Sequence, residues 1–280
     1  MNAATAADLA SGKGHKDENF PVASWLVKPE HRAPIMAFYR FARAADDISD
    51  NAAAPPHEKL GRLEAMRAGL TGWDDSEPTA AGLRKTIVSH GLDSTHALDL
   101  LEAFRRDVTK LRYESWNDLI GYCRVSAMPV GRFVLDVHGE SRDTWPASDA
   151  LCAALQVINH LQDCAEDYRN LNRVYLPQDM LAAAGARTEE LASERASPAL
   201  RGVIADCARR CDGLLAQSAG FSRMIRDRRL ALEVAVIQRL AVSLTAKLKR
   251  RDPLSERVHH SKPEALALAS LAAIGRIVGQ

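Results

Sequence analysis

Apolar residues recur at spacings of three and four along most of the chain, the periodicity of helices that bury one face. No run of alternating β-branched residues is bounded by a hairpin turn, so no strands are expected. Proline and glycine fall mostly between the periodic stretches, where they end helices. The pattern predicts an all-α protein. Helices are expected over residues 31–50, 57–71, 79–90, 95–109, 116–137, 147–169, 199–219 and 228–249.

Length and composition limit how many domains the chain can form. The 280 residues lie near the upper limit for one hydrophobic core, and 46% of them are hydrophobic, too many for a disordered chain. No internal repeat of solenoid length is present. We therefore expect a flexible segment over residues 1–17 and one domain over residues 18–280. That domain would be a bundle of about eight to ten helices with a polar loop at 185–198.

The charge balance and the cysteines narrow the range of partners and compartments. Lys and Arg total 37 against 36 for Asp and Glu, which argues against nucleic acid because phosphate backbones select basic proteins. The five cysteines form no CxxC pair and are expected to be reduced thiols. Neither a secretory signal nor an apolar window of membrane-spanning length is visible, so a cytoplasmic protein is expected.

One face of the first expected helix, 31–50, carries four polar side chains in line. They are Tyr39, Arg43, Asp46 and Asp50, at spacings of four, three and four. The helix expected over 147–169 repeats the arrangement at spacings of three, four and four. Its four polar residues are Gln156, Asn159, Asp163 and Asp167. The other positions in both helices are mostly apolar or small, as in helices that are buried on their remaining sides.

Two acidic stripes in apolar helices are an electrostatic problem without a cation. Like charges at this spacing cost about 0.2–0.5 kcal/mol per pair even on an exposed helix, and buried unpaired carboxylates cost far more. A single stripe of this kind is more often a solvated helix face than a metal site. Two of them, each preceded by aligned polar residues, favour Mg²⁺, which takes oxygen ligands and commonly links carboxylates to substrate phosphates. The pattern therefore predicts Mg²⁺ ions that bind a diphosphate.

Four blocks of the sequence resemble the squalene/phytoene synthase family, and the similarity extends over nearly the whole chain. The blocks are the two polar stripes, Tyr122-Cys123-Arg124-Val125-Ser126-Ala127-Met128-Pro129-Val130-Gly131-Arg132, and Arg173-Val174-Tyr175-Leu176-Pro177. The resemblance implies the all-α isoprenoid synthase fold, with a central cavity and the two aspartate-rich helices facing each other across it.

The same resemblance implies a role for each residue of the stripes. Mg²⁺ would be bound by Asp46, Asp50, Asn159, Asp163 and Asp167. Arg43 and Arg173 would contact diphosphate oxygens, while Tyr39 and Tyr175 would line the reaction site. Gln156 would be a polar group in the cavity wall.

Several other residues have a structural interpretation beside the functional one. Arg132 would bind diphosphate or form a structural ion pair, and Phe20 would contact the prenyl chain or only pack in the core. His160 lies off the polar stripe, so it is interpreted as a core or surface histidine. His259 and His260 have no third ligand at a suitable spacing, so no zinc site is expected.

Within the family, the chain most resembles the branch that forms hydroxysqualene in bacterial hopanoid biosynthesis. Gln162 stands where enzymes that condense two prenyl diphosphates usually carry Arg, and Lys16, Asp17 and Asn19 stand where those enzymes carry a segment with His and Ser. A neutral Gln162 would suffice for a single diphosphate and could hold a water near the substrate. The resemblance implies Mg²⁺-dependent conversion of presqualene diphosphate to hydroxysqualene by ionisation, cation rearrangement and water capture. No nicotinamide is expected, since no GxGxxG motif follows a strand.

Three alternatives remain open at this point. The same fold could condense two prenyl diphosphates into presqualene diphosphate, phytoene or dehydrosqualene, or it could be a terpene cyclase or a non-catalytic helical scaffold. The expected partners are a prenyl diphosphate substrate and other hopanoid-pathway enzymes, with no nucleic acid. A basic run followed by apolar residues 265–274 predicts peripheral contact with a membrane. The run comprises Lys247, Lys249, Arg250, Arg251, Arg257 and Lys262.

Overall fold

The computed structural model describes residues 27–278, with side chains up to Gly275. The expected flexible segment 1–17 and Phe20 lie outside the described residues. Within the described part the chain is helical and forms no strand, as predicted, apart from an isolated parallel bridge between Arg112 and Val174. No helix of this part is long and apolar enough to cross a bilayer.

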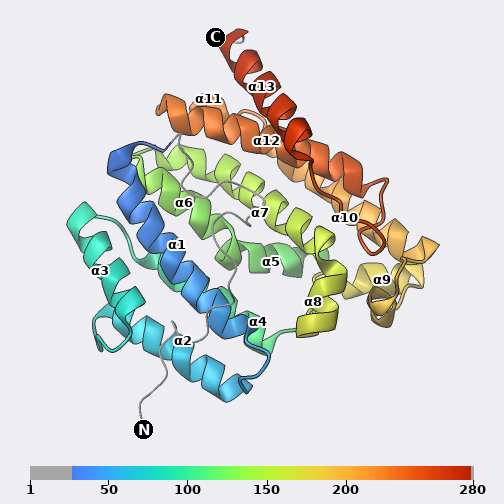
Figure 1. Ribbon diagram of the computed structural model, residues 1–280, viewed down its shortest axis with the longest axis horizontal. Helices are drawn as coiled ribbons and strands as arrows, with labels where there is room; N and C mark the ends of the chain where they lie inside the picture. The colour runs from blue at the N-terminus through green and yellow to red at the C-terminus, as the bar shows by residue number, and fades with distance from the viewer. Residues whose placement is uncertain (1–26, 279–280) are drawn as a thin grey trace. The chain divides into compact units, whose positions relative to one another are not determined.

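Backbone contacts divide the chain into two compact units, which we describe separately (Figure 1). Of the described residues, unit 1 comprises 27–110 and 129–140, and unit 2 comprises 111–128 and 141–278. The helices of unit 1 are α1 (Pro29–Asp50), α2 (Pro56–Thr71), α3 (Pro78–His90), α4 (Thr95–Thr109) and most of α6 (Met128–Val137). That residues 18–280 act as a single domain stays a prediction.

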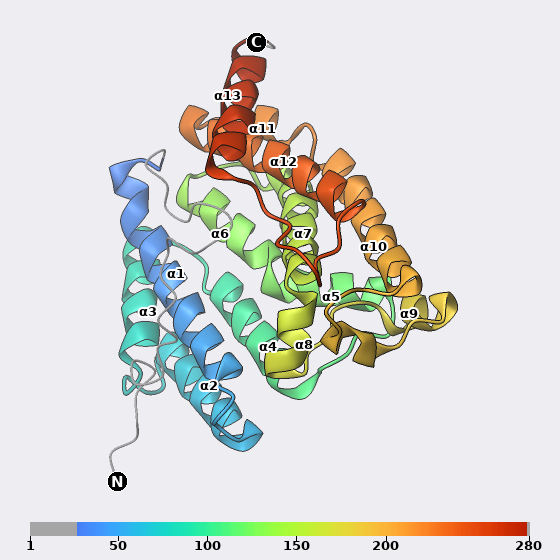
Figure 2. The same cartoon turned by 45° about the vertical axis from the view of Figure 1, so that its right-hand side comes forward.

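Unit 2 contains the remaining helices. These are α5 (Trp116–Ser126), α7 (Trp145–Gln162), α8 (Cys164–Leu171), α9 (Gln178–Ala184), α10 (Pro198–Gln217), α11 (Phe221–Met224), α12 (Arg228–Leu248), α13 (Lys262–Val278) and the 3₁₀ helices η2 (Arg142–Thr144) and η3 (Thr188–Ala192). In Figures 1 and 2, α13 follows α12 and carries the C-terminus. All five cysteines are free thiols, and burial raises the pKa of Cys123 to about 12.

Helix α1 begins and ends where the sequence sets its limits, and one face of it forms the core of unit 1. Pro29 stands at its first position, where the missing N–H costs no hydrogen bond. At the other end, the Asn51 side chain accepts hydrogen bonds from the backbone N–H groups of residues 53 and 54. The buried face packs on α2, α3 and α4, and Phe38 stacks on Phe133 of α6 with ring centroids 4.0 Å apart. This packing fixes which face of α1 carries the polar stripe.

Helix α7 is the centre of unit 2, where it packs against α5, α10 and α12. Small residues such as Ala150, Ala153 and Ala154 are buried along it and allow its neighbours to approach closely. The segment after α8 runs beside residues 111–113, because the Val174 N–H donates to the Leu111 carbonyl at 2.9 Å. This pairing determines where Tyr175 lies in unit 2.

Two of the expected helices are each divided in two. The expected helix 116–137 is interrupted at Ala127, because Pro129 lacks the N–H that would continue the hydrogen-bond ladder. The expected helix 147–169 is interrupted at Asp163. There the N–H groups of Asp163 and Asp167 still bond to the carbonyls four residues earlier, so the polar stripe keeps its helical spacing.

Five short or terminal helices were absent from the expected set. They are α9, α11, α13 and the 3₁₀ helices η2 and η3. The η3 helix lies inside the stretch 185–198, which was expected to be a loop. Its first turn is stabilised by Glu190, whose side chain accepts a hydrogen bond from the Arg187 backbone N–H at 2.8 Å.

Candidate functional site

Helix α1 carries a cluster of charged residues that we call the α1 cluster: Arg43, Asp46, Asp47, Asp50 and, from α4, Asp107. Arg43 pairs with Asp46 at 3.1 Å through Nη1 and with Asp47 at 2.9 Å through Nη2. Asp46 and Asp47 are three and four residues beyond Arg43, so one guanidinium reaches both carboxylates. Asp47 lies off the predicted stripe, yet it is the more buried of the two aspartates, with 10% of its side chain exposed against 35% for Asp46.

The second aspartate of the stripe, Asp50, is held by its neighbour. The Ser49 hydroxyl lies 3.1 Å from Asp50 Oδ1 and 3.0 Å from the Asp46 carbonyl oxygen. Ser49 is fully buried, and its own carbonyl accepts a hydrogen bond from Lys59 of α2. The C-terminal turn of α1 is therefore a rigid support for Asp50. Tyr39, the first residue of the predicted stripe, is half-buried one turn before Arg43.

The carboxylates of the α1 cluster destabilise one another. Burial among protein atoms, reinforced by the negative charges of Asp50, Asp107 and Asp47, raises the pKa of Asp46 to about 8. Arg43 acts in the opposite direction but does not compensate. Asp107 is itself buried, with 5% of its surface exposed. The cluster thus has more negative charge than its own arginine neutralises, and it presents oxygen donors, which are the ligands that Mg²⁺ prefers. The residues present fit a divalent cation.

Unit 2 carries the second set of predicted ligands, which we call the α7–α8 cluster: Gln156, Asn159, His160, Asp163 and Asp167. The four residues of the predicted stripe are half-buried, whereas Val157, Ile158 and Leu161 between them are buried. Asp163 lies at the junction of α7 and α8, with φ −103° and ψ 9°. Two amide oxygens, from Gln156 and Asn159, are followed along this face by the carboxylates of Asp163 and Asp167, which again suits a hard cation.

His160, to which the sequence analysis assigned no functional role, is at the centre of this cluster. Its Nε2 atom lies 3.1 Å from Gln156 Nε2, and its Nδ1 atom lies 3.7 Å from Asp167 Oδ2. The imidazole also stacks on the Tyr175 ring, with centroids 3.4 Å apart and an interplanar angle of 13°. Only 11% of the His160 side chain is exposed. This burial agrees with the interpretation as a core histidine, and both ring nitrogens and one ring face have a polar or aromatic partner.

Three tyrosines pack together beside the imidazole in unit 2, where Tyr175 and Tyr122 contact His160 and Tyr113 contacts both of them. Tyr175 lies 5.5 Å from Tyr113 and 5.6 Å from Tyr122, measured between ring centroids. All three rings are buried, with 7% or less of each residue exposed. The resulting aromatic wall has large faces of negative electrostatic potential, which attract cations. It joins Tyr175, a predicted site residue, to two tyrosines that come from other segments of the chain.

The remaining predicted site residues have different surroundings. Gln162 is buried, and its amide NH₂ donates to the Val258 carbonyl, which ties the end of α7 to the segment before α13. Arg173 is buried beside the α7–α8 cluster, where its backbone N–H donates to the Asp167 carbonyl. Burial raises the pKa of Asp99 in unit 1, and the positive charges of His96 and Arg132 oppose this rise, so the predicted role of Arg132 stays a prediction.

Sequence reasoning missed three contributors to these clusters, and for two of them a pattern was available. Asp47 stands four residues after Arg43, and His160 stands four residues after Gln156, so both are helix neighbours of a predicted site residue. For Asp107 no pattern was available, since it reaches the α1 cluster from another helix. Phe20 lies outside the described residues, so its predicted contact with substrate stays a prediction.

Comparisons with known proteins agree over nearly the whole chain. The squalene/phytoene synthase family model matches residues 13–264. The hydroxysqualene synthase of Zymomonas mobilis is 60% identical over 278 residues, covering 99% of this chain and 94% of that protein. The hydroxysqualene synthase of Rhodopseudomonas palustris is 54% identical, covering 96% and 92%.

Solved structures show the same fold. The squalene synthase HpnC from Alicyclobacillus acidocaldarius superposes with a TM-score of 0.73 at 31% identity, covering 88% of this chain and 92% of that one. A dehydrosqualene synthase superposes with a TM-score of 0.77 at 21% identity, covering 94% and 93%. The second likeness concerns the fold alone, and both agree with the helical architecture described above.

Proposed function

Because this chain belongs to the squalene/phytoene synthase family, we propose that it converts presqualene diphosphate to hydroxysqualene in hopanoid biosynthesis. It is an isoprenoid synthase with the isoprenoid synthase fold, and it acts on a prenyl diphosphate. The observation that carries the assignment is 60% identity, over nearly the full length of both chains, with a hydroxysqualene synthase. This likeness favours an enzyme over the scaffold and terpene cyclase alternatives.

We propose that the α1 cluster and the α7–α8 cluster each bind Mg²⁺. The ligands would be Asp46, Asp50, Asn159, Asp163 and Asp167. Bound Mg²⁺ neutralises charge that develops on the leaving diphosphate. The oxygen donors of both clusters and the excess negative charge around Asp46 support this proposal. Arg43 adds a cation whose direction is fixed by Asp46 and Asp47, and a planar guanidinium suits diphosphate oxygens.

The aromatic wall of unit 2 has a role after the diphosphate leaves. The cyclopropylcarbinyl cation that forms then rearranges before water captures it. The faces of Tyr113, Tyr122 and Tyr175 attract positive carbon without attacking it, since a neutral phenol is a weak nucleophile. Buried rings also exclude bulk water, which would capture the cation before it rearranges. Tyr39 is proposed to line the reaction site and Arg173 to contact diphosphate oxygens, as the family resemblance implies.

A product assay tests the function directly. Purified protein with Mg²⁺, without any reductant, should turn presqualene diphosphate into a C30 alcohol that carries one oxygen from water. Farnesyl diphosphate alone should give little presqualene diphosphate, because Gln162 stands where enzymes that condense two prenyl diphosphates usually carry Arg. Efficient condensation of farnesyl diphosphate would instead identify an enzyme that joins two prenyl diphosphates.

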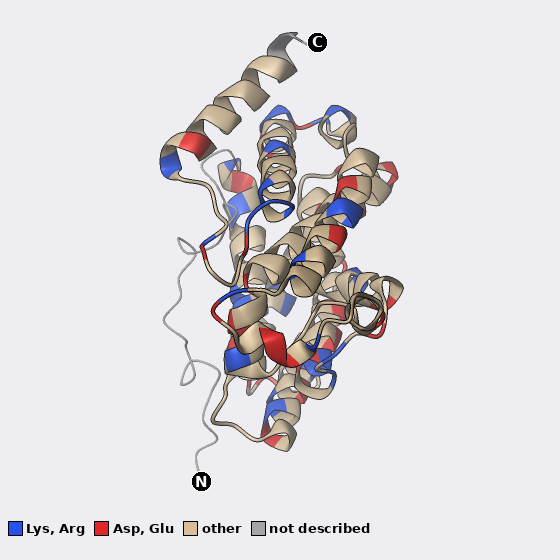
Figure 3. Cartoon of the chain, turned by 90° about the vertical axis from the view of Figure 1, so that its right-hand side faces the viewer, with Lys and Arg blue, Asp and Glu red and all other residues tan. Residues whose placement is uncertain are grey.

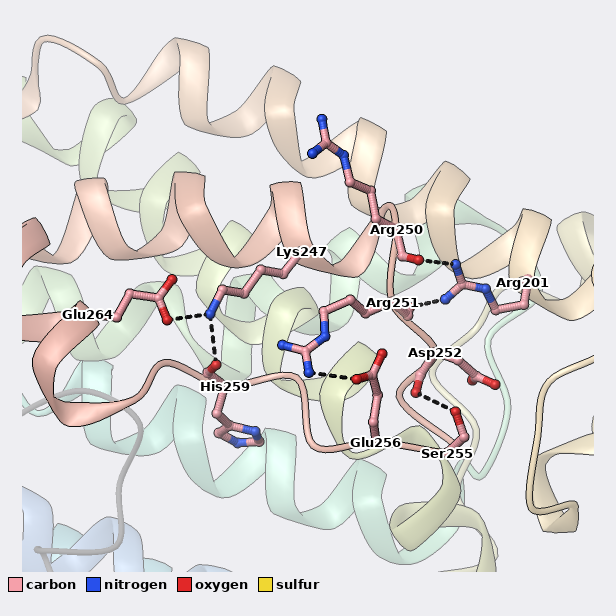
Figure 4. A network of polar contacts seen from close by, with 9 residues as sticks. All are labelled: Arg201, Lys247, Arg250, Arg251, Asp252, Ser255, Glu256, His259 and Glu264. Carbon is pink, nitrogen blue, oxygen red and sulfur yellow. Dashed lines mark hydrogen bonds and ion pairs between the residues drawn. The ribbon is translucent and has the colours of Figure 1, made fainter.

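We also propose a peripheral membrane contact, but on a different basis from the predicted basic run. Lys247 pairs with Glu264 at 2.6 Å, Lys249 with Asp212 at 2.7 Å, and Arg251 with Glu256 at 2.6 Å. Figure 4 shows the first and third of these pairs. Three of the six cations of the run are thus paired within the protein, so the basic run is weaker support than the sequence indicated.

Apolar side chains of α13 and nearby arginines support the contact better. Leu266, Leu271 and Ile274 are 70%, 50% and 57% exposed, and Figure 3 shows no charged residue on α13 beyond its first turn, up to its grey end. A groove of about 600 Å³ between α12 and α13 is lined by Leu271, with Arg223 and Arg239 beside it. These two arginines have no ion pair within the described residues. An anionic bilayer would receive both kinds of side chain.

Vesicle sedimentation tests the membrane contact without truncating the chain. Leu266→Glu with Leu271→Glu should reduce pelleting with phosphatidylglycerol vesicles, while Val88→Glu, which alters a similarly exposed residue of α3, should not. Equal pelleting of the wild-type protein and both variants would contradict the contact. Association with other hopanoid-pathway enzymes stays a prediction.

A further inference from the structure

The imidazole of His160 is held from three directions in unit 2. The Tyr175 ring covers one of its faces, Asp167 Oδ2 lies 3.7 Å from Nδ1, and the Gln156 amide contacts Nε2 at 3.1 Å. A side chain with 11% exposure and partners on three sides has one orientation available. His160 is therefore a fixed reference point for whatever it contacts on the α7–α8 face.

The contact between His160 and Gln156 fixes a side-chain amide. The Gln156 NH₂ group donates a hydrogen bond to His160 Nε2, so that ring nitrogen is the acceptor and carries no proton. The ring proton is then on Nδ1, which points toward the negative charge of Asp167. With its NH₂ group committed, Gln156 turns its carbonyl oxygen, Oε1, the other way. Gln156 is half-buried, and no group within the described residues donates to Oε1.

We propose that Gln156 Oε1 holds the water that captures the substrate cation, and that His160 is the positioning residue that aims Gln156. The inference rests on the proposed function, because only a reaction that ends in an alcohol needs such a water. Oε1 accepts a hydrogen bond from one O–H group of the water, and a lone pair on the water oxygen then points at the cationic carbon of the substrate.

The capture step balances with groups that the reaction itself supplies. A C–O bond forms between the water oxygen and the cationic carbon, and the resulting oxonium loses one proton. The released diphosphate is a base and takes that proton. Gln156 neither gains nor loses a proton, so it is chemically unchanged after the step. A neutral amide is also a poor nucleophile, so it orients water near a carbocation without being alkylated, as a free carboxylate would be.

Gln156 suits this role better than Gln162, the residue that the sequence favoured for holding water. Gln162 is 7% exposed, and its amide NH₂ group donates a hydrogen bond to the Val258 carbonyl. Gln156 lies on the polar stripe with Asn159 and Asp163, the face that the proposed function assigns to substrate. The water-binding group is thus on the same face as the proposed ligands.

The test compares products formed by variants that alter only this pair. His160→Phe keeps a flat ring for Tyr175 to stack on but removes the nitrogen that accepts from Gln156. Gln156→Met keeps the length of the side chain but removes its carbonyl. Each should lower the ratio of hydroxysqualene to non-oxygenated C30 products by about fivefold, which corresponds to the loss of one neutral hydrogen bond. The double variant should be no worse than Gln156→Met alone, since His160 acts through Gln156.

Controls separate this positioning role from a general loss of activity. Gln178→Met removes another half-buried amide of unit 2 and should leave the product ratio unchanged. Diphosphate release and the Mg²⁺ concentration for half-maximal rate, followed in each variant, report ionisation independently of water capture. An unchanged product ratio in folded His160→Phe and Gln156→Met would overturn the inference, as would a fall in diphosphate release as large as the fall in alcohol. If the wild-type protein forms no alcohol, the proposed function itself has failed.

Discussion

The α1 cluster and the α7–α8 cluster share the same aspartate spacing but differ in what surrounds it. Around Asp46 there are three further carboxylates and a single guanidinium, and burial with this crowding raises the pKa of Asp46 to about 8. Asp167 lies beside the His160 imidazole, which in turn contacts the Gln156 amide and stacks on the Tyr175 ring. The first surrounding is almost wholly charged, and the second is mostly neutral and aromatic.

This difference indicates that the two clusters have different roles, which the spacing of their aspartates alone does not reveal. A crowded set of carboxylates gains most when a cation arrives, so the α1 cluster is suited to attract and hold Mg²⁺. A half-buried face with neutral donors and π surfaces can orient a water and tolerate a carbocation as well as ligate metal. The predictions that follow would break or sharpen this contrast, beginning with the largest expected effect.

Loss of an aspartate from either stripe should be severe. Asp46→Asn, Asp50→Asn, Asp163→Asn and Asp167→Asn should each lower turnover of presqualene diphosphate by about a hundredfold or more, the scale on which a lost electrostatic contact to a leaving group is felt. Diphosphate release measures the effect, and circular dichroism confirms folding. If the variants of one cluster kept near-normal turnover in Mg²⁺, the proposed contrast between the α1 cluster and the α7–α8 cluster would be wrong.

Mg²⁺ binding to the α1 cluster should depend on pH. Because Asp46 has a pKa of about 8 without metal, a proton competes with the cation below that pH. The apparent Mg²⁺ affinity should fall by up to about tenfold for each pH unit below 8, with uptake of the metal releasing a proton. Calorimetry in two buffers of different ionisation enthalpy measures both. Asp46→Asn should abolish the proton release, and a pH-independent affinity in the wild-type protein would show that Asp46 is not titrating.

The same carboxyl should affect stability in chelator. The pKa of Asp46 rises from its ordinary value of 3.8, expected in the unfolded chain, to about 8 in the folded protein. Below pH 3.8 both forms are protonated, and between about 4 and 8 only the folded form keeps the proton. The free energy of unfolding should therefore fall as pH rises through this window, and the loss is complete above pH 8. Asp46→Asn removes this loss, so at pH 8 it should melt a few degrees higher than the wild-type protein.

A matched control keeps the stability test specific. Asp206→Asn removes an exposed carboxylate of α10 and should change the melting temperature little at any pH. Added Mg²⁺ should narrow or reverse the advantage of Asp46→Asn, because only the wild-type carboxylate binds the ion. A lower melting temperature for Asp46→Asn in chelator at pH 8 would mean that its pairing with Arg43 outweighs the repulsion.

The helical period explains how much of these clusters the sequence predicted. Positions four apart share a helix face whatever the tertiary structure, so the line from Asp46 to Asp50 needed only the confirmed helix. Contacts that depend on other segments were not accessible: Asp107 reaches the cluster from α4, and Tyr175 meets His160 only because residues 111–113 pair with the segment after α8. The break at Ala127 was predictable from Pro129, although the apolar period across it was continuous.

The smallest expected effect belongs to Asp47, which lies in the α1 cluster but off the stripe. Its carboxylate holds Arg43 Nη2 at 2.9 Å, so Asp47→Asn would loosen the guanidinium while it relieves part of the repulsion on Asp46. These consequences oppose each other: a less fixed Arg43 binds diphosphate less well, and a more readily ionised Asp46 binds Mg²⁺ better. The expected net result is a fall of about two- to fivefold in kcat/KM, consistent with one charge-assisted contact partly replaced by the amide, together with a stronger Mg²⁺ affinity near neutral pH. A loss as large as that of Asp46→Asn would place Asp47 among the metal ligands, and the α1 cluster would then bind its cation through the whole run of aspartates instead of one helix face.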